Sequence, residues 1–279
     1  MMFVTAYRAS KILFNFLVSN RFAKPFLIPC NVCEVIPQTF DLAGVCYEYV
    51  DIEKSSWCLD QEKVLNKVND YAGMLFVRTY GVEHDQEDFF RQIKAKNSSF
   101  VIIDDSCLCV PDTAEVQTFA DVRLFSLGEK KQVDLGNGGF AFVNDHLMYC
   151  EAPAPINSFL KDGSWTFDLS LLEKERAKIL VHKQKLNAIY HQLLPKHIQF
   201  ESVYNNWRFN IFVENKQVIL DALFKNQLFA SSHYRPMTKS MCMCPNAFFL
   251  YDHVVNLFND KYYTTEQAIR TCEIINQYL

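Results

Sequence analysis

A pair of carboxylates and a pair of lysines are the side chains whose types and spacing in this sequence suit covalent chemistry. Asp104 and Asp105 follow the apolar run 100–103, which has the pattern of a strand buried on both faces. Lys130 and Lys131 follow the next apolar run. A lysine forms a Schiff base with a carbonyl, and an aspartate can keep the proton on a pyridinium nitrogen. Together the two groups suit the binding of pyridoxal phosphate (PLP).

The elements around these residues decide whether they meet. The run 122–127 predicts a second strand with Ser126 near its end, and a glycine-rich turn follows at 136–139. Open α/β sheets bind their ligands at the carboxyl edge of the strands. We therefore expect Asp105, Ser126 and Lys131 to face one crevice.

Each of these residue types also has an ordinary structural role. An aspartate at a strand end is commonly a helix cap or a turn former, and a lysine pair before a glycine turn is commonly part of a solvated loop. The order and spacing kept over about forty residues favour the functional interpretation, because single short motifs are weak signals and combinations are stronger.

Two segments carry a family resemblance: IIDDSCLC at 102–109 and FADVRLFSLGEKKQVDLGNGGFAFVND at 119–145. They resemble the DegT/DnrJ/StrS family of PLP-dependent sugar aminotransferases. The resemblance implies PLP as the cofactor, with Asp105 at the ring nitrogen and Ser126 on the phosphate. Aligned without gaps, the family's Schiff-base lysine falls on Lys131 and not on Lys130.

The same resemblance implies further contacts outside these segments. The family holds the cofactor phosphate at a helix start that aligns with Thr5 and Ala6, and it covers one face of the ring with the residue at Cys33. HYRP, at residues 233–236, resembles a loop at the family's domain junction and implies substrate contacts by His233 and Tyr234.

Strands alternate with helices through the first half of the chain, which predicts a mostly parallel sheet. The fold class expected is α/β, a mostly parallel sheet flanked by helices, like the large domain of PLP transferases, with a smaller C-terminal α+β domain. The expected division is a PLP-binding domain at 1–150, a linker at 151–168 and a small domain at 169–279. Residues 5–20 are expected to form one helix.

Composition excludes several classes of partner. The net charge of -4 and the pI near 6.0 give no electrostatic basis for binding nucleic acid or an anionic membrane. The N-terminal apolar patches are interrupted by Arg8 and Lys11, so neither a membrane span nor a signal peptide is expected. A cytoplasmic protein is the expectation.

Ten cysteines raise the question of metals and disulfides. The closely spaced pairs are Cys30 with Cys33, Cys107 with Cys109, and Cys242 with Cys244. Only the first has a two-residue spacer, and no second such pair completes a zinc site. A thioredoxin-like redox pair at Cys30 and Cys33 is an alternative, but we expect reduced, largely buried thiols and no metal.

The resemblance implies amino transfer from an amino-acid donor, usually glutamate, to a keto sugar nucleotide, in polysaccharide or amino-sugar biosynthesis, by a homodimer. Two departures from the family favour an alternative, a catalytically inactive homologue with a binding or assembly role. Leu108 stands where the family has Gln or His, and the family's Asn and Arg motif that reaches the neighbouring subunit is not found. A nucleotide-binding enzyme unrelated to PLP ranks last, because no glycine-rich dinucleotide loop follows the first strand.

Overall fold

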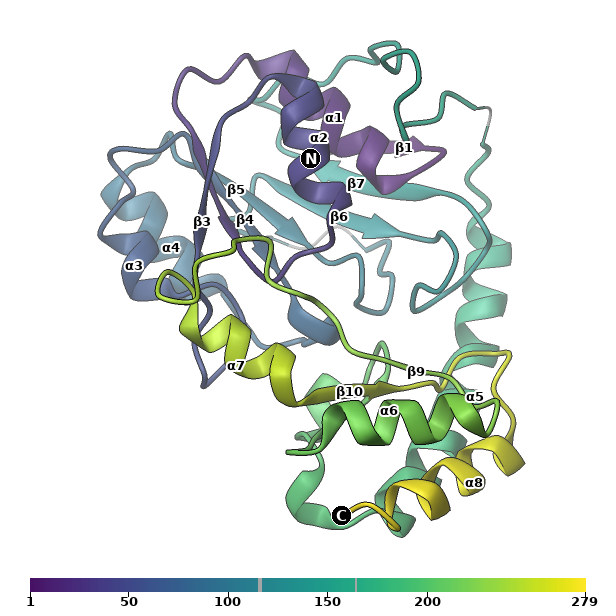
Figure 1. Cartoon of the computed structure of the whole chain (residues 1–279). Coiled ribbons are helices and arrows are strands. Elements are labelled where there is room, and N and C mark those ends of the chain that lie inside the picture. Colours follow the sequence, from purple (N-terminus) through teal and green to yellow (C-terminus); the bar gives the residue numbers. More distant parts are fainter. Residues whose placement is uncertain (115–116, 164) are drawn as a thin grey trace.

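The structure is a computed structural model that describes residues 1–114, 117–163 and 165–279. Within these residues two sheets dominate (Figure 1). The larger has the strand order β1-β7-β6-β5-β4-β2-β3. Its strands are β1 (Met2–Ala6), β2 (Phe26–Pro29), β3 (Tyr47–Val50), β4 (Gly73–Val77), β5 (Val101–Asp105), β6 (Val122–Ser126) and β7 (Gly139–Val143).

Neighbouring strands from β3 to β6 are parallel, and β7 is antiparallel to both β6 and β1. The predicted mostly parallel sheet flanked by helices is therefore confirmed. The apolar run alone suggested that Asp104 and Asp105 follow the strand. In the structure they are instead the last two residues of β5. Since β6 and β7 are antiparallel neighbours, the loop between them, residues 127–138, returns along the same sheet edge and carries both lysines.

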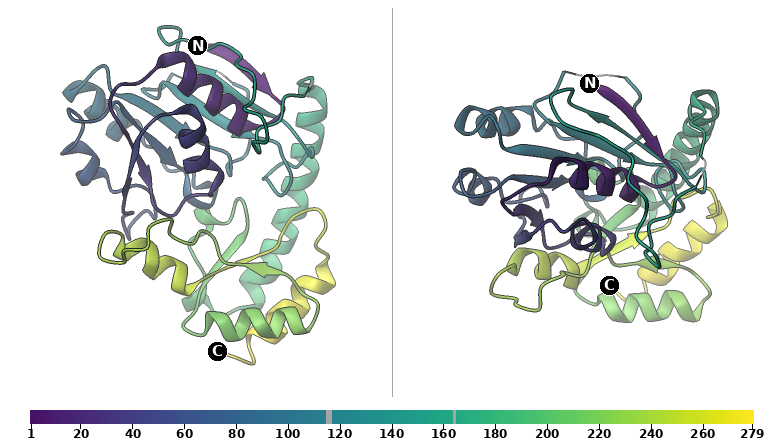
Figure 2. Two further views of the ribbon diagram at one scale, coloured as in Figure 1. Left: turned by 45° about the horizontal axis from the view of Figure 1, so that its top comes forward. Right: turned by 90° about the horizontal axis from the view of Figure 1, so that it is seen from above.

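Helices cover both faces of the larger sheet (Figures 1 and 2). α1 (Ala9–Asn20) and α2 (Val35–Ala43) share one apolar core with Val101 and Ile103 of β5. Ile102 faces the opposite core, which includes residues of α4 (Glu87–Lys96) and α7 (Pro245–His253). Side chains alternate between the faces of a strand, so each buried strand serves both cores.

The start of the chain differs from the prediction. Thr5 and Ala6 belong to β1, where they pair with Phe140 and Gly139, and α1 begins only at Ala9. The prediction of one helix over 5–20 is therefore wrong for its first four residues. The apolar spacing that predicted the helix starts at Ile12, whereas the earlier segment MFVTA contains the strand-prone residues Phe3, Val4 and Thr5 and pairs with the edge of β7.

The rest of the chain builds a smaller sheet of order β8-β10-β9 with its own core. The long helix α5 leads into it, and α6 and α8 pack on it (Figures 1 and 2). A capping box between Thr264 and Gln267 begins the last helix. The remaining elements are α3 (Gln61–Leu65), α5 (Leu169–Leu193), β8 (Phe209–Phe212), α6 (Lys216–Lys225), β9 (Ala230–Ser231), β10 (Val254–Leu257), α8 (Thr265–Ile275) and the 3-10 turns η1 (Thr79–Gly81), η2 (Lys196–Ile198) and η3 (Ser202–Tyr204).

Among the described helices, none combines the length and the apolar character needed to cross a membrane.

Candidate active site

A cavity of about 410 Å³ lies at the carboxyl edge of β4, β5 and β6, on the face covered by α1 and α2. Its wall contains six of the eight residues singled out from the sequence: Cys33, Asp105, Ser126, Lys131, His233 and Tyr234. The carboxyl ends of the parallel strands and the loop after β6 therefore bring the carboxylate, the hydroxyl and the lysine together, as the strand pattern predicted.

Asp105 is 6% exposed and forms part of the cavity wall. Its Oδ1 accepts a hydrogen bond from the backbone N–H of Cys107, 3.0 Å away, which fixes the orientation of the carboxylate. Burial raises the pKa of Asp105, while the hydrogen bonding of Cys107 and the positive charge of Lys131 oppose the rise. A cationic group placed in the cavity would favour the ionised carboxylate further.

The loop that presents the two lysines is held from several sides. The carboxylate of Asp134 accepts hydrogen bonds from the backbone N–H groups of Lys130 (3.0 Å) and Gly136 (2.8 Å). Trp207 Nε1 donates to the carbonyl of Lys130 at 2.8 Å. Both lysines line the cavity, and the positive charge of Lys131 lowers the pKa of Asp105.

The N-terminus of α1 lies at one end of the cavity, where Arg8, Ala9 and Ser10 join Ser126 in the wall. The first N–H groups of a helix lack partners inside the helix and attract anions. Gly139 makes this approach possible, because a Cβ at Gly139 would lie 2.6 Å from the backbone nitrogen of Ala9.

Thr5 and Ala6 are not among the residues of that wall, because they lie in β1, which ends before α1 begins at Ala9. The sequence reasoning placed the helix start too early. The strand-prone run before Ala9 was the signal that could have corrected it.

His233 and Tyr234 close the cavity from the smaller sheet. The backbone N–H of His233 donates to Asn256 Oδ1 at 2.8 Å, and its carbonyl accepts from the Tyr80 hydroxyl at 2.6 Å. Burial, together with the charges of Arg208 and the two lysines, lowers the pKa of His233 to about 4. Its imidazole is therefore neutral at pH 7 and available for hydrogen bonding.

Trp207 is a member of the wall that the sequence did not point to. Its ring lies within 10° of parallel to the ring of Tyr234, with the centroids 6.4 Å apart. No spacing rule connects Trp207 with the lysine loop, since the two meet only when the smaller sheet packs against the larger one.

Cys33 and Leu108 complete the apolar part of the wall. Cys33 lies between β2 and α2, and presents a thiol where an aromatic ring would give more stacking area. Leu108 is buried, and its side chain offers no hydrogen bond to the cavity. Leu108 stands where the family has Gln or His, so this part of the cavity wall lacks a polar group.

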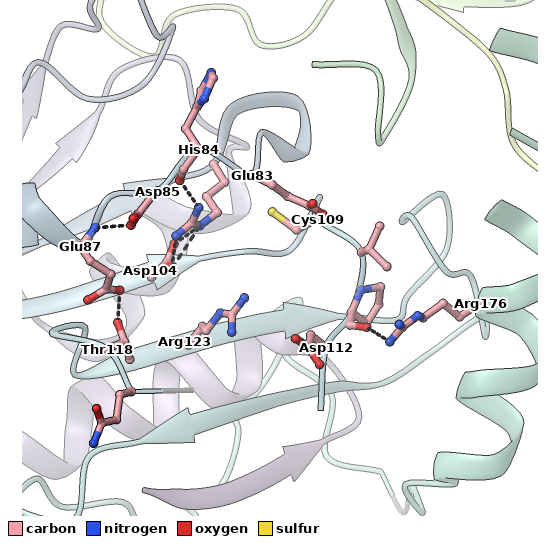
Figure 3. A pocket seen from close by; sticks show the side chains of 14 residues that line it. Glu83, His84, Asp85, Glu87, Asp104, Cys109, Asp112, Thr118, Arg123 and Arg176 are labelled. Carbon is pink, nitrogen blue, oxygen red and sulfur yellow. Dashed lines mark hydrogen bonds and ion pairs between the residues drawn. The ribbon is translucent and has the colours of Figure 1, made fainter. Parts of the chain in front are cut away.

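A second cavity, of about 460 Å³, lies beyond Asp104 on the opposite face of the sheet (Figure 3). Its polar groups largely bond one another. Arg78 pairs with Asp104, Glu87 accepts from Thr118, and Arg176 donates to the carbonyl of Pro111. Its described wall contains no lysine, so it lacks the group that a Schiff base requires.

Residues 41–154, which include Asp105, Ser126 and Lys131, match the model of one protein family. That family is the DegT/DnrJ/EryC1/StrS aminotransferases. The resemblance predicted from the two segments is therefore confirmed. DegT-family aminotransferases use PLP as their cofactor. No curated protein sequence matches the chain.

Solved structures of aminotransferases have the same fold as this chain. A DegT-family aminotransferase from Brucella abortus is 15% identical, with a TM-score of 0.76, covering 100% of this chain and 86% of that one. PseC of Helicobacter pylori, an aminotransferase of pseudoaminic acid biosynthesis, is 14% identical with a TM-score of 0.77, covering 99% and 86%. A Streptococcus pneumoniae protein described as a sugar aminotransferase, in its PLP form, is 16% identical with a TM-score of 0.76, covering 99% and 88%.

Proposed function

We propose that this chain is a PLP-dependent aminotransferase that moves an amino group from an amino acid to a keto sugar nucleotide. The observation that carries the proposal is the placement of Lys131 and Asp105 in one cavity, with the charge of Lys131 acting on the buried carboxylate. The DegT-family match over residues 41–154 supports the same assignment.

The donor set of the cavity fits PLP. The cofactor needs an amine for its carbonyl, an anion site for its phosphate, and a carboxylate for its ring nitrogen. Lys131 offers the amine and Asp105 the carboxylate. Ser126 and the start of α1 at Ala9 and Ser10 offer hydroxyl and N–H donors for the phosphate, and the close approach permitted by Gly139 brings that helix end to the cavity.

When bound, PLP supplies a conjugated ring that accepts the electron pair left on a substrate carbon after its proton departs. The remaining work belongs to the chain. Lys131 Nζ would bind the cofactor's carbonyl carbon and, once an incoming amine has displaced it, carry the proton away from and back to carbon as base and acid. Asp105 would hold the proton on the ring nitrogen by accepting its N–H hydrogen bond.

The wall from the smaller sheet would orient the substrate. His233 is neutral at pH 7, so its ring can donate or accept a hydrogen bond without adding charge. Burial raises the pKa of Tyr234, which keeps its phenol protonated and able to donate. Two hydrogen-bonding groups of this kind suit the hydroxyls of a sugar.

We further propose that glutamate is the donor, that the chain acts in amino-sugar or polysaccharide biosynthesis, that it is cytoplasmic and that it assembles as a homodimer. These parts of the proposal rest on the resemblance of the sequence segments and on the family match. PseC, with the same fold, is an aminotransferase involved in the biosynthesis of pseudoaminic acid.

The test is an absorbance spectrum of the purified chain after incubation with PLP, recorded also for Lys131→Ala and for Lys130→Ala as the matched control. We expect a visible band of protein-bound PLP that survives in Lys130→Ala and is lost in Lys131→Ala. Lack of any band in the unmutated chain would contradict the proposal. Binding of a nucleotide sugar without that band would favour the inactive homologue.

A further inference from the structure

Two thiols and one carboxylate meet at a buried point away from the cofactor cavity. Cys30, Asp51 and Cys244 place their sulfur and carboxylate atoms within 4.8 Å of one another. All three residues are at most 1% exposed. They come from three separate segments: Cys30 follows β2, Asp51 follows β3, and Cys244 immediately precedes α7. Sequence spacing could not reveal the cluster, because each of the two cysteines belongs to a different close pair.

Hydrogen bonds with the backbone hold Cys30 and Asp51 in place. Cys30 donates its N–H to the carbonyl of Val50 at 3.1 Å and accepts from the N–H of Met237 at 2.8 Å. The two oxygens of Asp51 each accept one N–H from the first turn of α7, from Asn246 at 3.1 Å and from Ala247 at 3.0 Å. The carboxylate is therefore oriented toward the thiols by bonds that leave lone pairs on both oxygens.

The Asp51 carboxylate caps the first turn of α7, and this cap stands directly beside two buried thiols. Two thiols at an apolar junction are ordinary, but here a buried carboxylate stands beside them. Among the described residues, the hydrogen-bond partners of that carboxylate are the two backbone amides, and no basic side chain pairs with it. Three groups that all become negative on losing a proton are gathered where water is excluded, which favours a cation as the missing component.

We propose that Cys30, Asp51 and Cys244 bind one thiophilic divalent cation of the zinc class through two thiolates and one carboxylate. Thiolate ligands select zinc over magnesium and calcium. Tetrahedral zinc holds such ligand atoms roughly 3.5–3.8 Å apart, so adjustments of about 1 Å suffice from the present geometry. Three protein ligands leave one coordination position for a water molecule. Binding releases the two thiol protons to solvent and leaves both thiolates on the ion.

The ion would act on the packing of the chain. It would tie the start of α7, which belongs to the C-terminal part of the sequence, to the ends of β2 and β3 of the larger sheet. The hydrogen bonds from α7 to Asp51 are the outer contacts that commonly orient a ligating carboxylate. Because the ion binds the folded chain, it should raise the free energy of unfolding.

The test uses the full chain, reduced and freed of metal with a chelator, and then titrated with Co²⁺ and with Zn²⁺. We expect one ion per chain, the absorbance bands of tetrahedral thiolate-bound cobalt, displacement of cobalt by zinc, and release of about two protons per ion at neutral pH. Cys30→Ser and Cys244→Ser should weaken binding at least 100-fold. Cys242→Ser, exposed and two residues from Cys244, is the matched control and should bind as the unmutated chain does.

Cobalt titration of the unmutated chain tests the proposal even where a variant fails to fold. A reduced chain that binds no cobalt with thiolate bands would overturn it. So would equal loss of binding in Cys242→Ser, which would mark an adventitious ion on exposed cysteines. A disulfide between Cys30 and Cys244 in the chain purified without reductant, with no ion bound after reduction, would identify a redox pair in place of a metal site. None of these readouts depends on aminotransferase activity.

Discussion

Asp104 and Asp105 are consecutive residues of β5, yet their carboxylates serve opposite faces of the sheet. Asp104 pairs with Arg78 on one face, with Arg78 Nε 2.8 Å from its Oδ1, and Asp105 lies with Lys131 in the cavity on the other. Because side chains alternate along a strand, one of two adjacent carboxylates is committed to structure and the other to the candidate site. The two residues therefore give separable predictions.

Asp105→Asn should reduce amino transfer on the order of 10²-fold, because the neutral amide cannot stabilise the protonated ring of the cofactor. The measurement is the rate at which glutamate bleaches the visible absorbance of the PLP-bound chain. Since Asn is close in size to Asp, the fold should be kept. An unchanged bleaching rate would remove Asp105 from the proposed mechanism.

Asp104→Asn should instead lower the free energy of unfolding, by about 2–4 kcal/mol, because it leaves the largely buried Arg78 guanidinium without its counter-charge. Arg78 donates to both oxygens of Asp104, which is 2% exposed. Denaturant unfolding of the metal- and cofactor-free chain measures the change. Asp88→Asn, which breaks the exposed pair with Arg91, is the control and should have little effect.

Gly139→Ala should disturb the junction between β7 and the start of α1. The new Cβ would lie 2.6 Å from the nitrogen and 2.8 Å from the Cα of Ala9, and backbone atoms cannot rotate away. We expect a loss of about 1–3 kcal/mol in unfolding free energy and weaker binding of PLP. Gly128→Ala is the matched control, because its Cβ would meet the nearest atom, Ser126 Oγ, at 3.7 Å. Equal effects of the two substitutions would contradict this account.

The stability of the cofactor-free chain should depend on His233 under mildly acidic conditions. The pKa of His233 is lowered to about 4 in the folded chain, whereas an unfolded histidine titrates near 6.5. Between these values the unfolded state binds more protons, so the free energy of unfolding falls as the pH drops from about 6.5 toward 4. His233→Gln should flatten this part of the profile of unfolding free energy against pH. An identical slope in both proteins would show that His233 does not contribute.

Local patterns were enough for much of the fold and for the chemistry. The apolar runs 100–103 and 122–127 predicted β5 and β6. The order of Asp105, Ser126 and Lys131 along the chain was sufficient to place them at one sheet edge, because parallel strands end at the same edge.

The strand β1 could not be predicted from local patterns, because its formation depends on a partner strand far along the chain. Thr5 and Ala6 are extended because β7, far along the chain, offers them an unpaired edge. A helix-like spacing that begins at Ile12 carries no information about that edge. Propensity is overridden where pairing with a distant strand supplies the backbone hydrogen bonds.

The sequence by itself determined the types of reactive group, the periods of the strands and helices that carry them, and the resemblance that links them to PLP. Only the tertiary structure decided which groups meet across long separations. It brought Trp207 to the lysine loop, His233 to a cavity that lowers its pKa, and Cys244 to Cys30 and Asp51. The physical reason is that strand and helix periods are local properties, whereas these contacts arise when α7 and the segment around Trp207 bury their apolar side chains against the larger sheet.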